Sequence, residues 1–120
     1  MKAIETLKQI RAKGNSGPYL RSMLGFEYLQ VGQAEQARTE LAASVRLLPN
    51  EPIGRSNFAL ALYALGEYDR AFQEITHALS LAPGNPTSEL ILQKILAKNP
   101  SSSNSEVDFN EPILDGRGRR

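Results

Sequence analysis

The chain has 120 residues, of which 41% are hydrophobic and 22% charged, and its formal net charge is +1. This indicates one soluble globular domain and excludes a strong overall attraction to nucleic acid or to an anionic membrane. The absence of cysteine excludes disulfides and thiolate metal sites. No apolar run approaches the ~20 residues of a membrane-spanning helix, and the first residues lack the apolar centre of a signal peptide. We therefore expect a cytoplasmic protein with no membrane insertion.

A period of 34 residues runs through the chain. A shift by this interval aligns identical residues at eight positions, namely Pro18 with Pro52 and Pro86, Arg21 with Arg55, Ser22 with Ser56, Gly32 with Gly66, Ala37 with Ala71, Glu40 with Glu74, Leu47 with Leu81, and Pro49 with Pro83. Self-similarity at such a period is the signature of a repeat architecture.

Each period is expected to form two helices. In residues 18–51, the apolar residues Leu20, Leu24 and Tyr28 recur at helical spacing, and a second helical series follows through Leu41 and Val45. Residues 52–85 repeat this pattern. The first helices are expected to end at Gly32 and Gly66. The second helices are followed by Pro49 and Pro83, and the next first helices open with Pro18, Pro52 and Pro86. The expected N-caps are Asn50 and Asn85.

Half units flank the two full repeats. Residues 1–14 resemble a second helix, with Ala3, Leu7 and Ile10 in register with Ala37, Leu41 and Ser44. Residues 86–98 resemble a first helix, with Leu92 and Leu96 in register with Phe58 and Leu62. Residues 1–100 are thus expected to form one helical repeat domain. Residues 101–120 have no helical period and are expected to be a disordered tail.

The repeat resembles the tetratricopeptide repeat family. The first unit carries Leu24, Gly25 and Tyr28 in an L-G-x-x-Y pattern, followed by Gly32, Ala37 and Pro49; the second matches at Gly66, Tyr68, Ala71, Ala78 and Pro83. It departs at Ala59 and Leu62, where the family favours Gly and Tyr, and both units have Arg (Arg21, Arg55) where the family often has Trp. The resemblance covers residues 18–98 and implies an all-α, right-handed α-solenoid.

No motif for catalysis or for a cofactor is found. His77 is the only histidine and is expected on the surface, and no phosphate-binding glycine loop is present. Glu40 and Glu74 recur with the repeat and are interpreted as a solvated face. The basic first helix has no aromatic residue to stack on bases. We expect a protein that is not an enzyme, needs no cofactor or metal, and does not bind nucleic acid.

The resemblance implies that the first helices line a concave groove. In this register the expected partner-binding residues are Tyr19, Ser22, Phe26, Leu29, Gln30, Ile53, Ser56, Asn57, Leu60, Tyr63, Thr87, Leu90, Ile91 and Lys94. In the alternative, Phe26, Leu60 and Tyr63 only complete the core. One branch of the family binds C-terminal carboxylates of chaperones through Asn, Lys and Arg; of the matching positions, only Asn57 fits, so that clamp is absent.

The sequence therefore favours an adaptor that holds a peptide or helix of another protein in a largely apolar groove. The alternative is a structural module, alone or within a longer protein, that forms a homodimer by stacking its terminal helices. Non-specific nucleic-acid binding is a third interpretation and predicts a steep salt dependence. The tail residues Val107, Phe109, Ile113 and Leu114 give a further hypothesis, in which the tail visits the groove and competes with partners.

Overall fold

The computed structural model describes residues 2–14 and 17–98, which fold into six α-helices and contain no strand. The helices are α1 (Lys2–Ala12), α2 (Pro18–Gln30), α3 (Ala34–Leu47), α4 (Pro52–Ala64), α5 (Tyr68–Leu81) and α6 (Pro86–Lys98). The expected all-α repeat architecture is confirmed. The tail expected at residues 101–120 lies outside the described residues.

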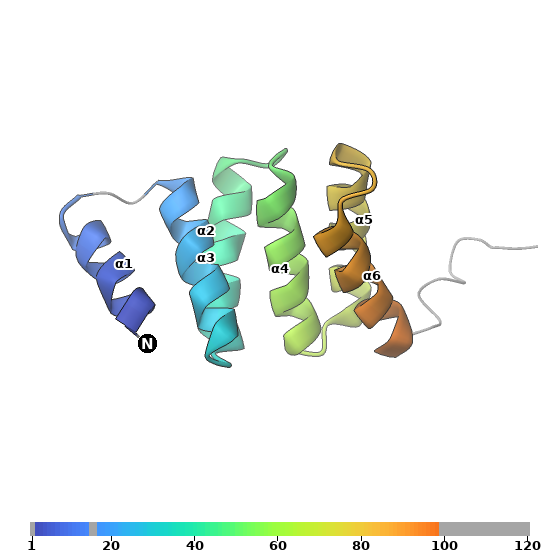
Figure 1. Ribbon diagram of the computed structural model, residues 1–120, viewed down its shortest axis with the longest axis horizontal. Helices are drawn as coiled ribbons and strands as arrows, with labels where there is room; N and C mark the ends of the chain where they lie inside the picture. The colour runs from blue at the N-terminus through green and yellow to red at the C-terminus, as the bar shows by residue number, and fades with distance from the viewer. Residues whose placement is uncertain (1, 15–16, 99–120) are drawn as a thin grey trace, which may run out of the picture.

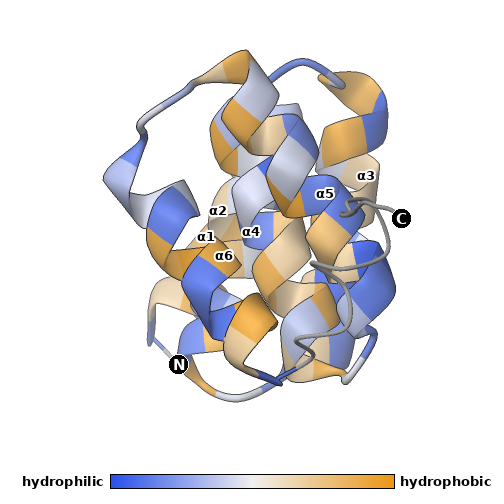
Figure 2. Cartoon of the chain, turned by 90° about the vertical axis from the view of Figure 1, so that its right-hand side faces the viewer, coloured by the Kyte–Doolittle hydropathy of each residue, from blue (hydrophilic) through white to orange (hydrophobic). Residues whose placement is uncertain are grey.

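The helices form an elongated array with extents of 59 × 25 × 21 Å (Figure 1). Figure 2, viewed from the α6 end, shows α2, α4 and α6 on one side and α3 and α5 on the other. Each first helix packs against the second helix of its own unit, and that helix packs against the next first helix. Within the described part of the chain, no helix combines the length and apolar character needed to cross a membrane.

Prolines and glycines bound the helices where the sequence predicts. Pro18 and Pro52 occupy the first turns of α2 and α4, while Gly32 and Gly66 adopt φ values of +79° and +81° after the first helices end. A positive φ is strained for other residues, so glycine sets these turns.

The expected N-caps are half right. Asn85 caps α6 by accepting a hydrogen bond from the backbone N–H of Ser88 at 3.0 Å. In the equivalent place of the other unit, Glu51 rather than Asn50 caps α4 and accepts from Gly54 N–H at 2.8 Å. The cap must immediately precede the proline turn, and Asn50 lies one residue too early.

The core is a continuous apolar stripe along the array. Its largest fully buried side chains are Leu24, Leu41, Leu62, Ile75 and Ile95, which come from five successive helices. Every helix thus buries its apolar side chains against neighbouring helices, as expected for a repeat array.

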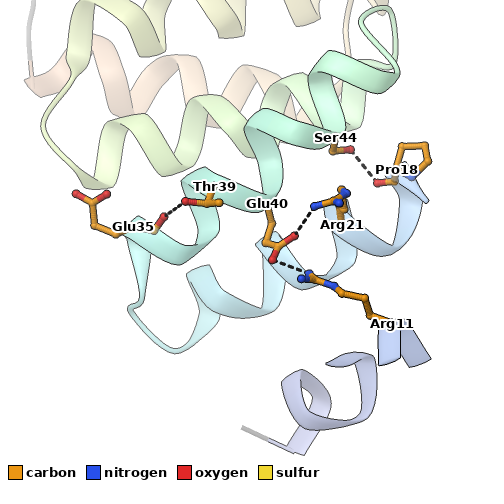
Figure 3. Close-up of polar contacts among 7 residues, drawn as sticks. All are labelled: Arg11, Pro18, Arg21, Glu35, Thr39, Glu40 and Ser44. Atoms are coloured by element: carbon orange, nitrogen blue, oxygen red, sulfur yellow. Dashed lines mark hydrogen bonds and ion pairs between the residues drawn. The ribbon is translucent and has the colours of Figure 1, made fainter. Parts of the chain in front are cut away.

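Glu40 and Glu74 are not a solvated face, contrary to the sequence interpretation. Glu74 pairs with Arg55 at 2.7 Å, and both side chains are about 15% exposed. Glu40 accepts from Arg21 at 3.5 Å and from Arg11 at 2.6 Å (Figure 3). The recurring Arg and Glu identities therefore form an equivalent ion pair between the two helices of each unit. These carboxylates need a cationic partner because they are largely removed from water.

The two end helices depart from the expected register. In α1, Ala3 and Ile10 are exposed, whereas Ile4 and Leu7 are buried. Helix α1 corresponds to α3, but no first helix precedes it in the described chain. The face of α1 that is equivalent to the α2-facing side of α3 therefore has no helix to cover it. Instead, α1 packs on α2 and buries Ile4 and Leu7.

In α6, Leu92 and Leu96 are only partly buried, and Ile91 and Ile95 enter the core instead. This helix packs back on α4 and α5, and no described helix follows to cover Leu92 and Leu96.

Candidate functional site

A groove of about 850 Å³ opens between α1, α2, α4 and the start of α6. We call it the apolar groove; its lining residues are Lys2, Ala3, Thr6, Leu7, Ser22, Met23, Phe26, Glu27, Ile53, Ser56, Asn57, Asn85, Thr87 and Ser88. This volume is within the range of ligand-binding clefts.

Helix α2 provides the central part of the groove. Ser22, Met23 and Phe26 lie on one side of the helix because residues four apart share a face. Leu24 and Tyr28 point to the core, which leaves Met23 and Phe26 54% and 40% exposed. The helix therefore presents apolar side chains on two faces, one packed and one open.

Helices α4 and α6 supply a mixed apolar and polar side. Ile53 in the first turn of α4 is 60% exposed. Deeper, the hydroxyl groups of Ser56 and Ser88 share a buried hydrogen bond of 2.6 Å that joins α4 to α6. Asn57 and Thr87 also line the groove and offer an amide and a hydroxyl for hydrogen bonding.

Helix α1 contributes residues that sequence reasoning missed, namely Lys2, Ala3, Thr6 and Leu7. The helix is held at one end by Arg11, which donates to Glu40 on α3 at 2.6 Å (Figure 3). Figure 2 places α1 on the side of α2, α4 and α6. A sequence signal existed in the three-residue step from Ile4 to Leu7, because a helix that buries this pair against α2 turns Ala3 and Thr6 away from it.

The groove is close to electrically neutral. Among the described residues, Lys2 and Glu27 are the only charged side chains that line it, and their formal charges cancel. The described residues contain no group of His, Cys, Asp and Glu side chains able to hold a metal ion. The arrangement offers apolar contact and a few neutral hydrogen-bonding groups.

All of the expected partner-binding residues except Ile91 divide into three sets. Ser22, Phe26, Ile53, Ser56, Asn57 and Thr87 line the apolar groove. Tyr19, Gln30, Leu90 and Lys94 are exposed but do not line it. Leu29, Leu60 and Tyr63 pack partly buried against the core, as the alternative for Leu60 and Tyr63 proposed.

Ile91 does not reach the groove surface at all. It is 3% exposed and belongs to the core, because α6 packs back on α4 and α5 through this face. The sequence register placed it with Asn57, which is half-buried in α4.

Comparison with known proteins gives matches to structures alone. No protein-family model and no curated protein matches the sequence. The solved first tetratricopeptide repeat domain of human RPAP3 is 22% identical, with a TM-score of 0.74 over 86% of this chain and 81% of that one. The second such domain of human RPAP3, solved in complex with the HSP70 peptide SGPTIEEVD, is 24% identical, with a TM-score of 0.69 over 77% of each chain. The chain therefore has the tetratricopeptide repeat fold.

Proposed function

We propose that the protein is an interaction module that holds a segment of a partner protein in the apolar groove. The observation that carries this proposal is the exposure of Met23, Phe26 and Ile53 at 54%, 40% and 60% around one cavity. Apolar side chains gathered on the surface of a folded protein typically mark an interaction site.

The structural comparison supports a peptide as the ligand, since a domain of the same fold binds one. The lining of the apolar groove favours a ligand whose chemistry differs from that of this peptide. The bound peptide of the RPAP3 domain carries three acidic residues in its sequence SGPTIEEVD. The apolar groove has Lys2 as its one described cation, with Glu27 also on its lining. We infer that its ligand is an apolar segment whose backbone bonds to neutral groups such as Asn57 and Thr87.

Two single variants test this function. Phe26→Ser and Ile53→Ser remove apolar surface from the groove, and we expect both variants to fold because both side chains are exposed. Partners are identified by affinity capture and mass spectrometry, and the affinity of the purified pair is then measured. We expect each variant to weaken binding by about tenfold or more, because a few aromatic and large side chains carry most of an interface.

Leu47→Ser is the matched control. Leu47 is 52% exposed on α3 and does not line the apolar groove. Its variant should bind as the original chain does, with the same helical circular dichroism. Unchanged affinity in both groove variants, or an equal loss in the Leu47 variant, contradicts the assignment of this surface.

A further inference from the structure

A second cleft, on a different face, is rich in arginine. It has a volume of about 470 Å³ and is lined mainly by α3, with contributions from α2, α4 and α5. Arg21, Arg38, Arg46 and Arg70 all border it, and we call it the arginine cleft. Ala42, Ala43 and Phe58 provide its apolar surface.

The charge of this cleft is not fully neutralised. Four of the six arginines in the described residues line it, and no Asp or Glu among those residues does. Arg21 pairs with Glu40, and Arg38 pairs with Glu35 and Glu67. Arg46 and Arg70 form no ion pair with any residue that the structure describes. Two guanidinium groups thus remain to attract an anion.

Three of the arginines are held in place by their contacts. The guanidinium of Arg70 lies over the Phe58 ring, 5.4 Å from its centroid. Arg38 is oriented by two carboxylates at 2.8 Å and 2.5 Å. Arg21 is held by its ion pair with Glu40 at 3.5 Å, although its Nε–H is buried without a partner in the described structure. Planar guanidinium groups fixed in this way match the two oxygens of a carboxylate, which a lysine ammonium does not.

The chain itself contains a segment of matching chemistry. Residues 106–115, EVDFNEPILD, hold four acidic residues and no basic one, and no other ten-residue stretch holds as many acidic residues. Val107, Phe109, Ile113 and Leu114 give the same segment an apolar content suited to Ala42, Ala43 and Phe58. We propose that residues 106–115 dock in the arginine cleft of their own chain.

The length of chain permits this contact. Arg70 lies on α5, which packs directly against α6, and α6 ends at Lys98. The eight residues from Lys98 to Glu106 span up to about 26–29 Å when extended. The array is 25 × 21 Å in cross-section. Such a tether holds the segment at an effective concentration near ~1 mM, so a weak electrostatic contact is sufficient.

The apolar groove, whose two charges cancel, gives the acidic residues no comparable attraction.

A spin label tests the contact in the full chain. The protein has no cysteine, so Asn110→Cys provides one unique attachment point. We expect the label to broaden the amide signals of Thr39, Ala42 and Ala43 selectively in an isotope-labelled sample. Raising the salt to 1 M should restore these signals, because the Debye length falls from about 10 Å at 0.1 M to about 3 Å.

Two double variants, each carrying the spin label, distinguish docking in the arginine cleft from a general attraction to positive charge. Arg46→Gln with Arg70→Gln should abolish the broadening. Lys94→Gln with Lys98→Gln removes the same charge from exposed residues of α6, next to the tail, and should preserve it. Equal effects of the two pairs, or broadening centred on Met23 and Phe26, would overturn the proposal. Broadening that persists when the spin label and the isotope reside on different chains would also overturn it, since the contact would then be with a neighbouring molecule.

Discussion

At the scale of single residues, two helical glycines have different surroundings. A Cβ atom added at Gly25 would lie 2.3 Å from Cγ of Leu41, which is a fully buried side chain. A Cβ atom at Gly54 would meet its nearest neighbours at 3.6 and 3.7 Å, which are ordinary contacts. Gly25 is therefore required by the close approach of α2 to α3, whereas Gly54 is not required by packing.

We expect Gly25→Ala and Gly54→Ala to change stability in opposite directions. Overpacking at Gly25 should lower the free energy of unfolding by about 1–3 kcal/mol, before the helix propensity gain of up to ~1 kcal/mol. Gly54→Ala has that gain without the clash and should stabilise the protein by up to ~1 kcal/mol. Urea unfolding followed by circular dichroism measures both. Equal and favourable effects would show that α2 and α3 are not in close contact at Gly25.

At the scale of elements, the buried faces of the internal helices were predictable, whereas those of the two terminal helices were not. The 34-residue period locates α2 to α5 because each of these helices has a neighbour on both sides, so identical positions have identical surroundings. The same register fails at Ile91 and Ile10 because α6 and α1 each lack one neighbour among the described helices. Periodicity identifies which residues are equivalent, but burial depends on whether the packing helix is present.

The groove shows the same limit. Phe26, Ile53 and Asn57 were predictable from the repeat register of the first helices, whereas Ala3 and Thr6 follow only from the step between Ile4 and Leu7. Nothing in the repeat determines where an unpaired helix such as α1 will lie. Its position depends on the contacts of Ile4 and Leu7 and on the ion pair between Arg11 and Glu40, two residues that lie far apart in the sequence.

Helix α1 is accordingly the element that we expect to open most readily. Among the described helices it packs only against α2, and Arg11 alone reaches α3. Arg11→Ala leaves Glu40 with the longer contact to Arg21, so amide hydrogen exchange in α1 should accelerate while α4 and α5 keep their protection.

Lys8→Ala is the control for this prediction, since Lys8 is exposed on the same helix and pairs with no described acidic residue. Exchange in α1 that rises equally in both variants would mean that the ion pair does not hold the helix.

At the scale of the whole molecule, the α6 end is unsuited to further stacking. Gln93 occupies the position equivalent to Gly25 and Ala59, where a small residue admits the following helix. A glutamine there is exposed and too large for the same close approach. Within the described residues, Gln93 thus places a polar side chain beside the partly buried Leu92 and Leu96 at this end of the array, as in the terminal repeats of soluble arrays.

We therefore expect the chain to be monomeric and not to stack through α6. Sedimentation or light scattering should give one mass at all protein concentrations. Gln93→Gly removes the obstacle and is the informative comparison, because association in that variant alone would identify Gln93 as the residue that prevents it. Concentration-dependent mass in the unaltered chain would favour a dimer instead.

The placement of the apolar groove has a mechanical consequence. One side of it belongs to α1 and another to the start of α6, and these two helices have no direct contact with each other. They are connected only through the interfaces in between, so the width of the opening follows the bend of the array. A ligand that prefers a narrow opening must curve the array, and one that prefers a wide opening must straighten it. The free energy needed to bend the solenoid therefore contributes to the affinity. Substitutions between the helices, far from any ligand contact, alter binding by changing the curvature.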